Sequence, residues 1–423
     1  MILPRFFLAA LFTTPALLVA AVVGTNTPAL PLTADRLASL PAAQRPTWEA
    51  YLARSEKLHA ADQAAFAAEL KAAGLAAPLV PVKGRAVSLN HDAAWFAAPE
   101  AARIADILVS FQTPAGGWNK NTNQTLAPRR LGERHGYEAG YVGTIDNDAT
   151  ITQLQFLAKT IAASRDTGVT PANAELAART AAWRVSFTGG LEYLLTAQYP
   201  NGGWPQVFPL EGSYHDAVTF NDGAIVNVLR LLRDVAVGRA EFAFVPAALR
   251  ERAAASTERG LACILASQIV AHGRRTVWCQ QVDVLTLVPV GARNYEMPSQ
   301  AGGESADVML FLMELPAPSP AAVAAVHDAA AWFQKTPLHD VAFKPAPDGT
   351  GRKLLAAPGA GPLWPRYSEI GTDRPLFGDR DLTIHDDVSE ISLERRNGYG
   401  WFGDAPKRAL DHYAKWAKAH PSK

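Results

Sequence analysis

The stretches FQTPAGGWNKN (111–121) and AQYPNGGWPQ (197–206) repeat one pattern, in which Gly-Gly-Trp follows a glutamine after three intervening residues. A looser third copy is SQIVAHGRRTVWCQQ (267–281). The tryptophans of the three copies lie 86 and 74 residues apart, about the length of two helices with their loops: Trp118, Trp204 and Trp278. Each copy follows an apolar helical segment, and the glycines permit positive φ just past a helix end. The repeat therefore predicts a ring of helical hairpins, an incomplete or complete α/α toroid.

Most of the chain shows the three- and four-residue spacing of apolar side chains that predicts helices. The spacing occurs in residues 34–76, 101–112, 148–164, 186–198, 222–236, 250–268, 303–315, 320–334 and 405–420. Strict alternation is hard to find, so the chain is predicted to be mainly α. From about residue 337 the helical spacing stops, and a stretch rich in Gly and Pro predicts long loops, which in a compact domain usually have a function.

The amino terminus, MILPRFFLAALFTTPALLVAAVVG (1–24), has the order of an export signal. One arginine precedes an apolar run, and small residues follow it. A membrane anchor is the alternative, but the run contains two threonines and a proline and is short for a span. We expect the mature chain to begin between Gly24 and about Ala34 and to be secreted or periplasmic. An N-terminal helical segment (25–100) would then precede the toroid domain (101–423).

The composition excludes some classes of partner. Forty basic and forty acidic residues cancel, so no overall field points to nucleic acid, and a polyanionic ligand would need a local cationic cluster. We expect a monomer that has no membrane partner after signal removal. Cys263 and Cys279 could form a disulfide or remain as two buried thiols. Zinc-protease, nucleophile-elbow and phosphate-loop motifs are not found in the sequence.

Two clusters of Asp and Asn precede apolar helices. Asp146, Asn147 and Asp148 lie in GTIDND (143–148), and Asp222 ends TFND (219–222). Hard carboxylate and amide oxygens suit a cation such as Ca²⁺. The alternative is helix capping, but a cap needs one such residue and three stand in a row. In a ring of hairpins both helix starts would open at the same mouth, and neither has the spacing of an EF-hand loop.

Two further clusters contain arginine. The first is WCQQ (278–281) followed by ARNYE (292–296), and the second is WPRY (364–367) followed by GDRD (378–381). Arginines in Gly/Pro-rich loops bind carboxylates through paired hydrogen bonds. The alternative interpretation of each single arginine is that it forms a salt bridge on the surface. The salt-bridge interpretation fits better for the two arginines of SLERRNGYGWFG, which lie on a helical stretch.

The motifs together resemble polysaccharide lyase family ten, the pectate lyases with an (α/α)₃ toroid. The resemblance covers roughly residues 100–404 and rests on seven motifs in order: GGWNKN, TIDNDAT, TFNDGAIVNVL, TVWCQQVD, GARNYEMPSQAGGES, PLWPRYSEIGTDRPLFGDRD and ERRNGYGWFG. It implies a Ca²⁺-assisted anti β-elimination that cleaves α-1,4-linked polygalacturonate. The implied site residues are the base Arg293, the calcium and substrate-carboxylate cluster Asp146, Asn147 and Asp222, and the substrate-binding residues Lys120, Arg366, Arg380 and Tyr295.

Arginine is an unusual base, because its ordinary pKa lies above 12. Nearby cations and a substrate-covered site would be needed to lower that pKa. The sequence also departs from the family pattern at Asn119, where proline is usual, at Asp148, where glycine is usual, and at Val282, where histidine is frequent. The extra charge of Asp148 beside the metal cluster could tighten calcium binding or compete with the substrate carboxylate.

Two rival functions remain at this stage. An inverting glycoside hydrolase would use Asp146 and Asp222 as base and acid, about 6.5–9.5 Å apart and without a metal. A non-catalytic carbohydrate-binding protein would use exposed tryptophans, but it leaves the Arg, Asp and Asn clusters without a role. The sequence does not choose between exo- and endo-action or decide the tolerance of methyl esters.

Overall fold

The computed structural model describes residues 22–140, 143–164 and 171–422. Most of the predicted signal peptide, residues 1–21, lies outside the described residues, whereas Val22–Gly24 form most of the strand β1 (Val22–Thr25). No helix in the described part of the chain combines the length and apolar character needed to cross a membrane.

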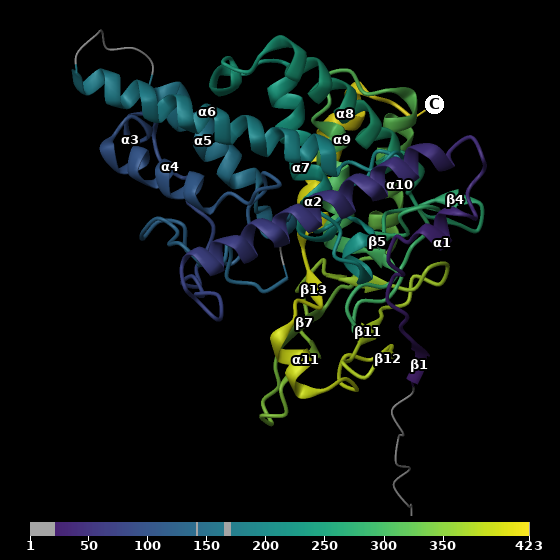
Figure 1. Ribbon diagram of the computed structural model, residues 1–423. Coiled ribbons are helices and arrows are strands. Elements are labelled where there is room, and N and C mark those ends of the chain that lie inside the picture. Colours follow the sequence, from purple (N-terminus) through teal and green to yellow (C-terminus); the bar gives the residue numbers. More distant parts are fainter. Residues whose placement is uncertain (1–21, 141–142, 165–170, 423) are drawn as a thin grey trace, which may run out of the picture.

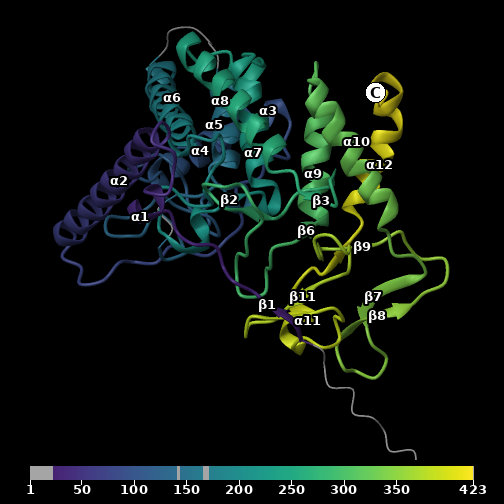
Figure 2. The same ribbon diagram turned by 90° about the vertical axis from the view of Figure 1, so that its right-hand side faces the viewer.

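The body of the molecule is made of three helical hairpins (Figures 1 and 2). Their inner helices are α5 (Ile151–Ala163), α7 (Ala224–Ala236) and α9 (Gly302–Met313), and their outer helices are α6 (Pro171–Ala197), α8 (Ala247–Ala266) and α10 (Pro320–Lys335). Each inner helix contacts the next inner helix, and each outer helix contacts the next outer one. The helices α4 (Pro99–Phe111) and α12 (Ala405–Ala419) pack at the two ends of this series. The predicted (α/α)₃ toroid is therefore confirmed.

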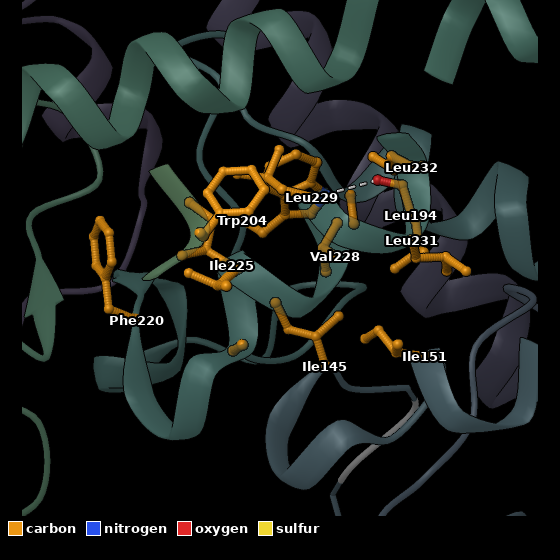
Figure 3. Packing of buried hydrophobic residues seen from close by; sticks show 14 of the residues in the cluster. Ile145, Ile151, Leu194, Trp204, Phe220, Ile225, Val228, Leu229, Leu231 and Leu232 are labelled. Carbon is orange, nitrogen blue, oxygen red and sulfur yellow. Dashed lines mark hydrogen bonds between the residues drawn. The ribbon is translucent and has the colours of Figure 1, made fainter. Parts of the chain in front are cut away.

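The repeated tryptophans are structural. Trp118, Trp204 and Trp278 are fully buried. Each indole N–H donates to a carbonyl of the preceding helix, at 2.7–2.8 Å: those of Leu108, Leu194 and Ile264. Figure 3 shows this bond for Trp204 within the aliphatic core that α7 contributes. Trp364 makes the same kind of bond to the Phe333 carbonyl at 3.1 Å, so a fourth copy exists that lacks the Gly-Gly-Trp pattern.

The repeated glutamines join one hairpin to the next. Gln198 Nε2 donates to the Gly202 carbonyl at 3.0 Å in its own turn and to the Ser256 carbonyl at 2.9 Å on the next outer helix. Gln112 and Gln268 make the same pair of bonds in their own turns and to the following outer helices. Because these amides satisfy buried carbonyls on both sides, the repeat fixes how neighbouring hairpins dock.

The N-terminal segment packs on the toroid and shares its core. It contains α1 (Ala34–Leu37), α2 (Arg45–Ala72) and α3 (Ala93–Phe96), and α2 crosses the front of the molecule in Figure 1. Trp48, Tyr51 and Leu52 of α2 belong to the same buried cluster as the toroid helices. The Tyr51 hydroxyl also donates to the Ala197 carbonyl at the end of α6, at 2.9 Å.

The region after residue 337 forms a second, smaller core together with residues 22–25 and 295–301. It contains the hairpin β7 (Val341–Pro345) with β8 (Arg352–Ala356) and the antiparallel sheet β1-β12-β11, with β12 at Thr383–His385 and β11 at Phe377–Gly378. Two-stranded pairs join β9 (Trp364–Pro365) to β13 (Phe402–Gly403) and β10 (Tyr367–Ser368) to β6 (Gln300–Ala301). The helix α11 (Leu393–Gly398) completes this lobe, which lies below the helices in Figure 2. The expected long loops are present, but the sequence analysis did not find the strands between them, because strands of two to five residues are too short to produce a periodic signal.

Two other short antiparallel pairs lie within the toroid part: β2 (Val218–Thr219) with β5 (Gln281–Val282), and β3 (Val270–Ala271) with β4 (Arg274–Arg275). Cys263 and Cys279 are buried free thiols, which settles the alternatives left open by the sequence.

Candidate active site

Two equivalent turns begin the inner helices α5 and α7. They are the one-turn 3₁₀ helices η1 (Asp146–Asp148) and η3 (Asn221–Gly223). Asn147 and Asp222 occupy matching positions with φ of 51° and 50°, and the next residues, Asp148 and Gly223, also have positive φ. The two turns contact each other, as the sequence predicted for both helix starts.

The polar side chains of these turns do not cap the helices. Neither η1 nor η3 has a side-chain cap bond at its start, and neither do α5 and α7, which follow Thr150 and Gly223. The capping interpretation is therefore not supported. Left-handed backbone at Asn147 and Asp222 is uncommon for residues other than glycine and is found repeatedly at binding sites.

A cavity of about 180 Å³ lies where the two turns meet the loop 291–296. Five of the predicted site residues line it: Lys120, Asp146, Asn147, Asp222 and Arg293. The other lining residues are Gln206, Tyr214, Asn221, Gln280, Gln281, Ala292 and Glu296. The structure thus brings together the residues that the sequence analysis predicted as base, substrate-binding lysine and metal cluster.

Asp146 is the buried acceptor of this cavity. It is 3% exposed and forms an ion pair with Lys120. Asn221 Nδ2 bridges the two turns, since it donates to Asp146 Oδ1 at 3.3 Å and to Asp222 Oδ2 at 3.0 Å. One amide nitrogen thus holds both carboxylates of the rival hydrolase pair.

The cavity supplies some of the oxygen ligands that a hard cation needs, but not a complete set. Asp146, Asp222 and Asn147 supply carboxylate and amide oxygens, which Ca²⁺ prefers. The Oε1 atoms of Gln206 and Gln281 are buried there without a hydrogen-bond partner. Among residues 22–140, 143–164 and 171–422, however, no three His, Cys, Asp or Glu side chains are grouped to hold a metal ion alone. A calcium ion here would need amide oxygens, water or a ligand carboxylate to complete its shell.

Arg293 forms a two-pronged ion pair with Glu296. Its Nε donates to Glu296 Oε2 at 2.8 Å, and its Nη2 contacts Oε1. Burial alone would lower the pKa of Arg293, but the hydrogen bonds and charge of Glu296 outweigh it and hold that pKa above its ordinary value. Burial would likewise raise the pKa of Glu296, and Arg293 holds it below the usual range. The sequence analysis expected cations to lower the pKa of Arg293, whereas this carboxylate acts in the opposite direction.

Arg366 lies beside the two turns, in a second hollow that shares Asp222 with the first cavity. Its Nη2 donates to Glu304 Oε1 at 2.7 Å and lies 3.7 Å from Asp222 Oδ1. Its guanidinium also lies 4.8 Å from the ring centre of Tyr399. Burial would lower the pKa of Arg366, but Glu304 and its other neighbours raise it, so this side chain is a fixed cation next to the cavity.

Tyr295 and Arg380 do not line the cavity at the two turns. Tyr295 is 5% exposed, and three guanidiniums surround its ring at 4.4–5.7 Å: those of Arg395, Arg293 and Arg380. Arg380 is largely exposed and pairs with Glu394. Tyr295 is therefore placed to support arginines rather than to offer a broad surface to a sugar. Arg395 does form a salt bridge, as expected, but it is buried against Tyr295 instead of lying on the surface.

Two short series of hydrogen bonds, which meet where the Tyr399 and Tyr367 hydroxyls touch, connect Arg293 to the Asp146 turn through residues that the sequence analysis gave no role. Glu296 accepts from Tyr399 at 2.6 Å, and the Tyr399 and Tyr367 hydroxyls lie 2.7 Å apart. The Tyr367 hydroxyl donates to Gln280, and Gln280 Nε2 donates to Asn221 Oδ1 at 2.6 Å. Gln280, Asn221 and Glu296 lie within recognised motifs, but only their spatial order reveals the connection.

Comparison with solved structures gives the class of protein to which this fold and site belong. The family 10 polysaccharide lyase from Cellvibrio cellulosa superposes with a TM-score of 0.65 and 31% identity, covering 79% of this chain and 99% of the lyase. A point mutant of that lyase in complex with trigalacturonic acid gives a TM-score of 0.65 and 30% identity, covering 80% and 100% of the two chains. The chain is a polysaccharide lyase in fold and class.

A match between the sequence and a model of a protein family identifies the family of this chain. Residues 112–410 match the family model described as pectic acid lyase, and the chain belongs to that family. No curated protein sequence matches the chain. The resemblance inferred from the seven motifs is thereby confirmed, and the protein is a lyase enzyme.

Proposed function

We propose that the protein cleaves α-1,4-linked polygalacturonate by Ca²⁺-assisted anti β-elimination, with Arg293 as the base. The observation that carries the proposal is that Arg293, Lys120 and the Asp146–Asn147–Asp222 cluster line one cavity. Membership of the pectic acid lyase family and the relative bound to trigalacturonic acid support an oligogalacturonate substrate. The product would be an oligogalacturonide with a 4,5-unsaturated non-reducing end.

The charges around the cavity suit the binding of a uronate. Arg366 and Lys120 are cations beside the two turns, and the N-termini of α5 and α7 add their positive dipole ends. Calcium bound at Asp146, Asn147 and Asp222 would neutralise the C6 carboxylate and stabilise the negative charge that develops there. These groups together make the neighbouring C5 proton more acidic.

The reaction itself requires a neutral Arg293. The guanidine accepts the C5 proton, the C5–H electron pair becomes the C4–C5 double bond, and the C4–O bond breaks. The departing glycosidic oxygen takes a proton from solvent. Because Glu296 stabilises the charged guanidinium, the neutral base forms in alkaline solution or after the substrate opens this ion pair.

Ultraviolet absorbance of the unsaturated product tests the function directly. Polygalacturonate should give rising absorbance with added Ca²⁺ and none with excess EDTA, and Ca²⁺ should restore the reaction. New reducing ends without absorbance would indicate the hydrolase instead. Binding without either signal would indicate a carbohydrate-binding protein.

Substitution of the base separates turnover from binding. Arg293→Ala should lower kcat by about 10³-fold or more, because general-base catalysis and a positioned cation are lost together. Oligogalacturonate binding, measured by calorimetry, should stay largely intact, since Arg366 and the calcium cluster remain. Retained turnover, or an equal loss of turnover and binding, would exclude Arg293 as the base.

We also propose that the chain is exported and works as a monomer. Mass spectrometry of the mature protein from the culture medium or periplasm and light scattering in solution test these two statements.

A further inference from the structure

The amino-terminal segment crosses the loop that carries Arg293. The strand β1 pairs with β12, and the chain then continues past Gly291, where Ala29 N donates to the Gly291 carbonyl at 2.8 Å. Further on, Leu32 N donates to Asp216 Oδ2 at 2.9 Å. These residues are distant from the loop in sequence, yet they form its outer wall.

Asn26 is the centre of this contact. Its side chain is buried, with 2% of the residue exposed. Its Nδ2 shares its two protons among three carbonyls of one loop: Arg293 at 2.8 Å, Asn294 at 3.0 Å and Glu296 at 3.1 Å. Gly291 makes room for it, because a Cβ at that position would lie 2.3 Å from Asn26 Oδ1.

The three carbonyls belong to a tight turn that sets the position of the Arg293 side chain. Ala292 N donates to the Glu296 carbonyl at 2.9 Å, and Glu296 N donates to the Arg293 carbonyl at 2.8 Å. The carbonyls therefore converge on one point, and their dipoles repel one another unless a donor lies between them. The Asn26 amide is that donor in this structure.

We propose that Asn26 is a positioning residue, which holds the loop 291–296 so that Arg293 and Glu296 face the cavity. This inference rests on the proposed role of Arg293 and adds a residue outside the matched family range of 112–410. Any processing of the amino terminus must then leave Asn26 in the chain for full activity.

Three substitutions in the full-length mature protein test the proposal. Asn26→Ala should lower kcat by about 10- to 100-fold with KM changed less than about twofold, because a misplaced reacting group affects turnover more than remote binding contacts. Asn26→Asp is nearly isosteric but places carboxylate oxygen against three carbonyls, so its kcat should fall at least as far. Asn26→Ser keeps one donor and should be intermediate.

Arg36→Ala is the matched control, because it should destabilise the amino-terminal segment without changing the loop 291–296. Arg36 braces the same segment by donating to the Leu30 and Pro31 carbonyls, both at 3.0 Å, and anchors it to the toroid through an ion pair with Asp283, without touching the loop 291–296. It should lower the unfolding midpoint while kcat stays within about twofold of wild type. Hydrogen exchange gives a readout besides activity: the Ala292 and Glu296 amides should exchange faster in Asn26→Ala and unchanged in Arg36→Ala.

Wild-type kcat and wild-type loop exchange in Asn26→Asp would overturn the proposal, and so would an equal kcat loss in Arg36→Ala. Arg293→Ala measured alongside separates the two hypotheses. An active Arg293→Ala would refute the base assignment, whereas an inactive Arg293→Ala with an unaffected Asn26→Asp would refute only the role of Asn26.

Discussion

Arg293 and Glu296 pose the central problem at the scale of single residues. A carboxylate bonded to both ends of a guanidinium favours the charged form, whereas proton abstraction needs the neutral one. Within the described residues, Glu296 is itself held by Tyr399 and almost fully buried, so it cannot simply turn away to solvent. In the proposed mechanism the ion pair would therefore set the pH at which Arg293 becomes a neutral base.

Glu296→Gln should move the rising limb of the kcat–pH profile to lower pH. The pKa of Arg293 is raised by Glu296, so removal of the negative charge lowers that pKa and makes neutral guanidine available in less alkaline solution. The shift should be about one pH unit or more, because Glu296 is buried and Arg293 is only partly exposed. Initial rates of unsaturated product from pH 7 to 11 measure it, and a limb that stays in place or moves upward would contradict this account.

Asp148 is the residue whose departure from the family pattern the structure explains best. Its position matches Gly223 in the second turn, and it also has positive φ, 60° against 74°. It accepts from Asn227 Nδ2 at 2.6 Å. Burial raises the pKa of Asp148, Asn227 opposes this, and the charges of Asp222 and Asp146 raise it further. An extra negative charge thus lies beside the predicted calcium ligands.

Asp148→Asn should weaken calcium binding by roughly three- to tenfold, because a charge interaction of about 1 kcal/mol is lost near the site. Calcium titration of activity and calorimetry measure the change. Asp348→Asn is the control, since it removes an equal charge from the β7–β8 hairpin, where Asp348 pairs with Lys353. An unchanged calcium midpoint in Asp148→Asn would mean that this charge acts on the substrate carboxylate or not at all.

At the scale of elements, the Gly-Gly-Trp turns are the part that the sequence predicts best. Glycine after a helix, a buried indole and a fixed spacing are local signals, and each corresponds to an observed contact. The fourth turn, at Trp364, lacks the glycines and was not found. The short strands of the smaller core were also missed, since their stability comes from partners distant in sequence, such as β1 with β12.

Gly202→Ala should destabilise the fold by about 2–4 kcal/mol. Gly202 has φ of +93°, and a Cβ there would lie 2.1 Å from the Arg259 carbonyl oxygen on the neighbouring outer helix α8. Gly273→Ala is the control with comparable φ, +74°, but open space around it, so its cost should be about 1 kcal/mol. Urea unfolding followed by tryptophan fluorescence measures both, and equal losses would show that the close approach of α8 is unimportant.

At the scale of the whole molecule, the cavity lies between the two cores. The toroid supplies Lys120 and the turns of α5 and α7, whereas the Tyr295, Tyr367 and Tyr399 side chains belong to or pack on the smaller core. The motifs in the sequence identified candidate site residues on both the toroid and the smaller core. They did not show how these residues connect, because contacts such as Asn26 to Arg293 or Gln280 to Tyr367 join segments that only the fold brings together.

Tyr367 and Tyr399 are the link between the two sides, and their substitution tests whether the cores act as one site. Tyr367 donates to Gln280 of the toroid and Tyr399 donates to Glu296, so the single proton of each hydroxyl is used and the 2.7 Å between them is a close contact of two oxygens. Tyr367→Phe and Tyr399→Phe should each lower kcat by about 5- to 30-fold, since loss of either hydroxyl removes one hydrogen bond from a buried acceptor at a cost of about 1–2 kcal/mol. If the two tyrosines act as one unit, the kcat of the double variant should lie within about twofold of the kcat of the slower single variant. Effects that multiply would instead mean that each tyrosine acts separately, Tyr399 on Arg293 through Glu296 and Tyr367 on the calcium turns through Gln280.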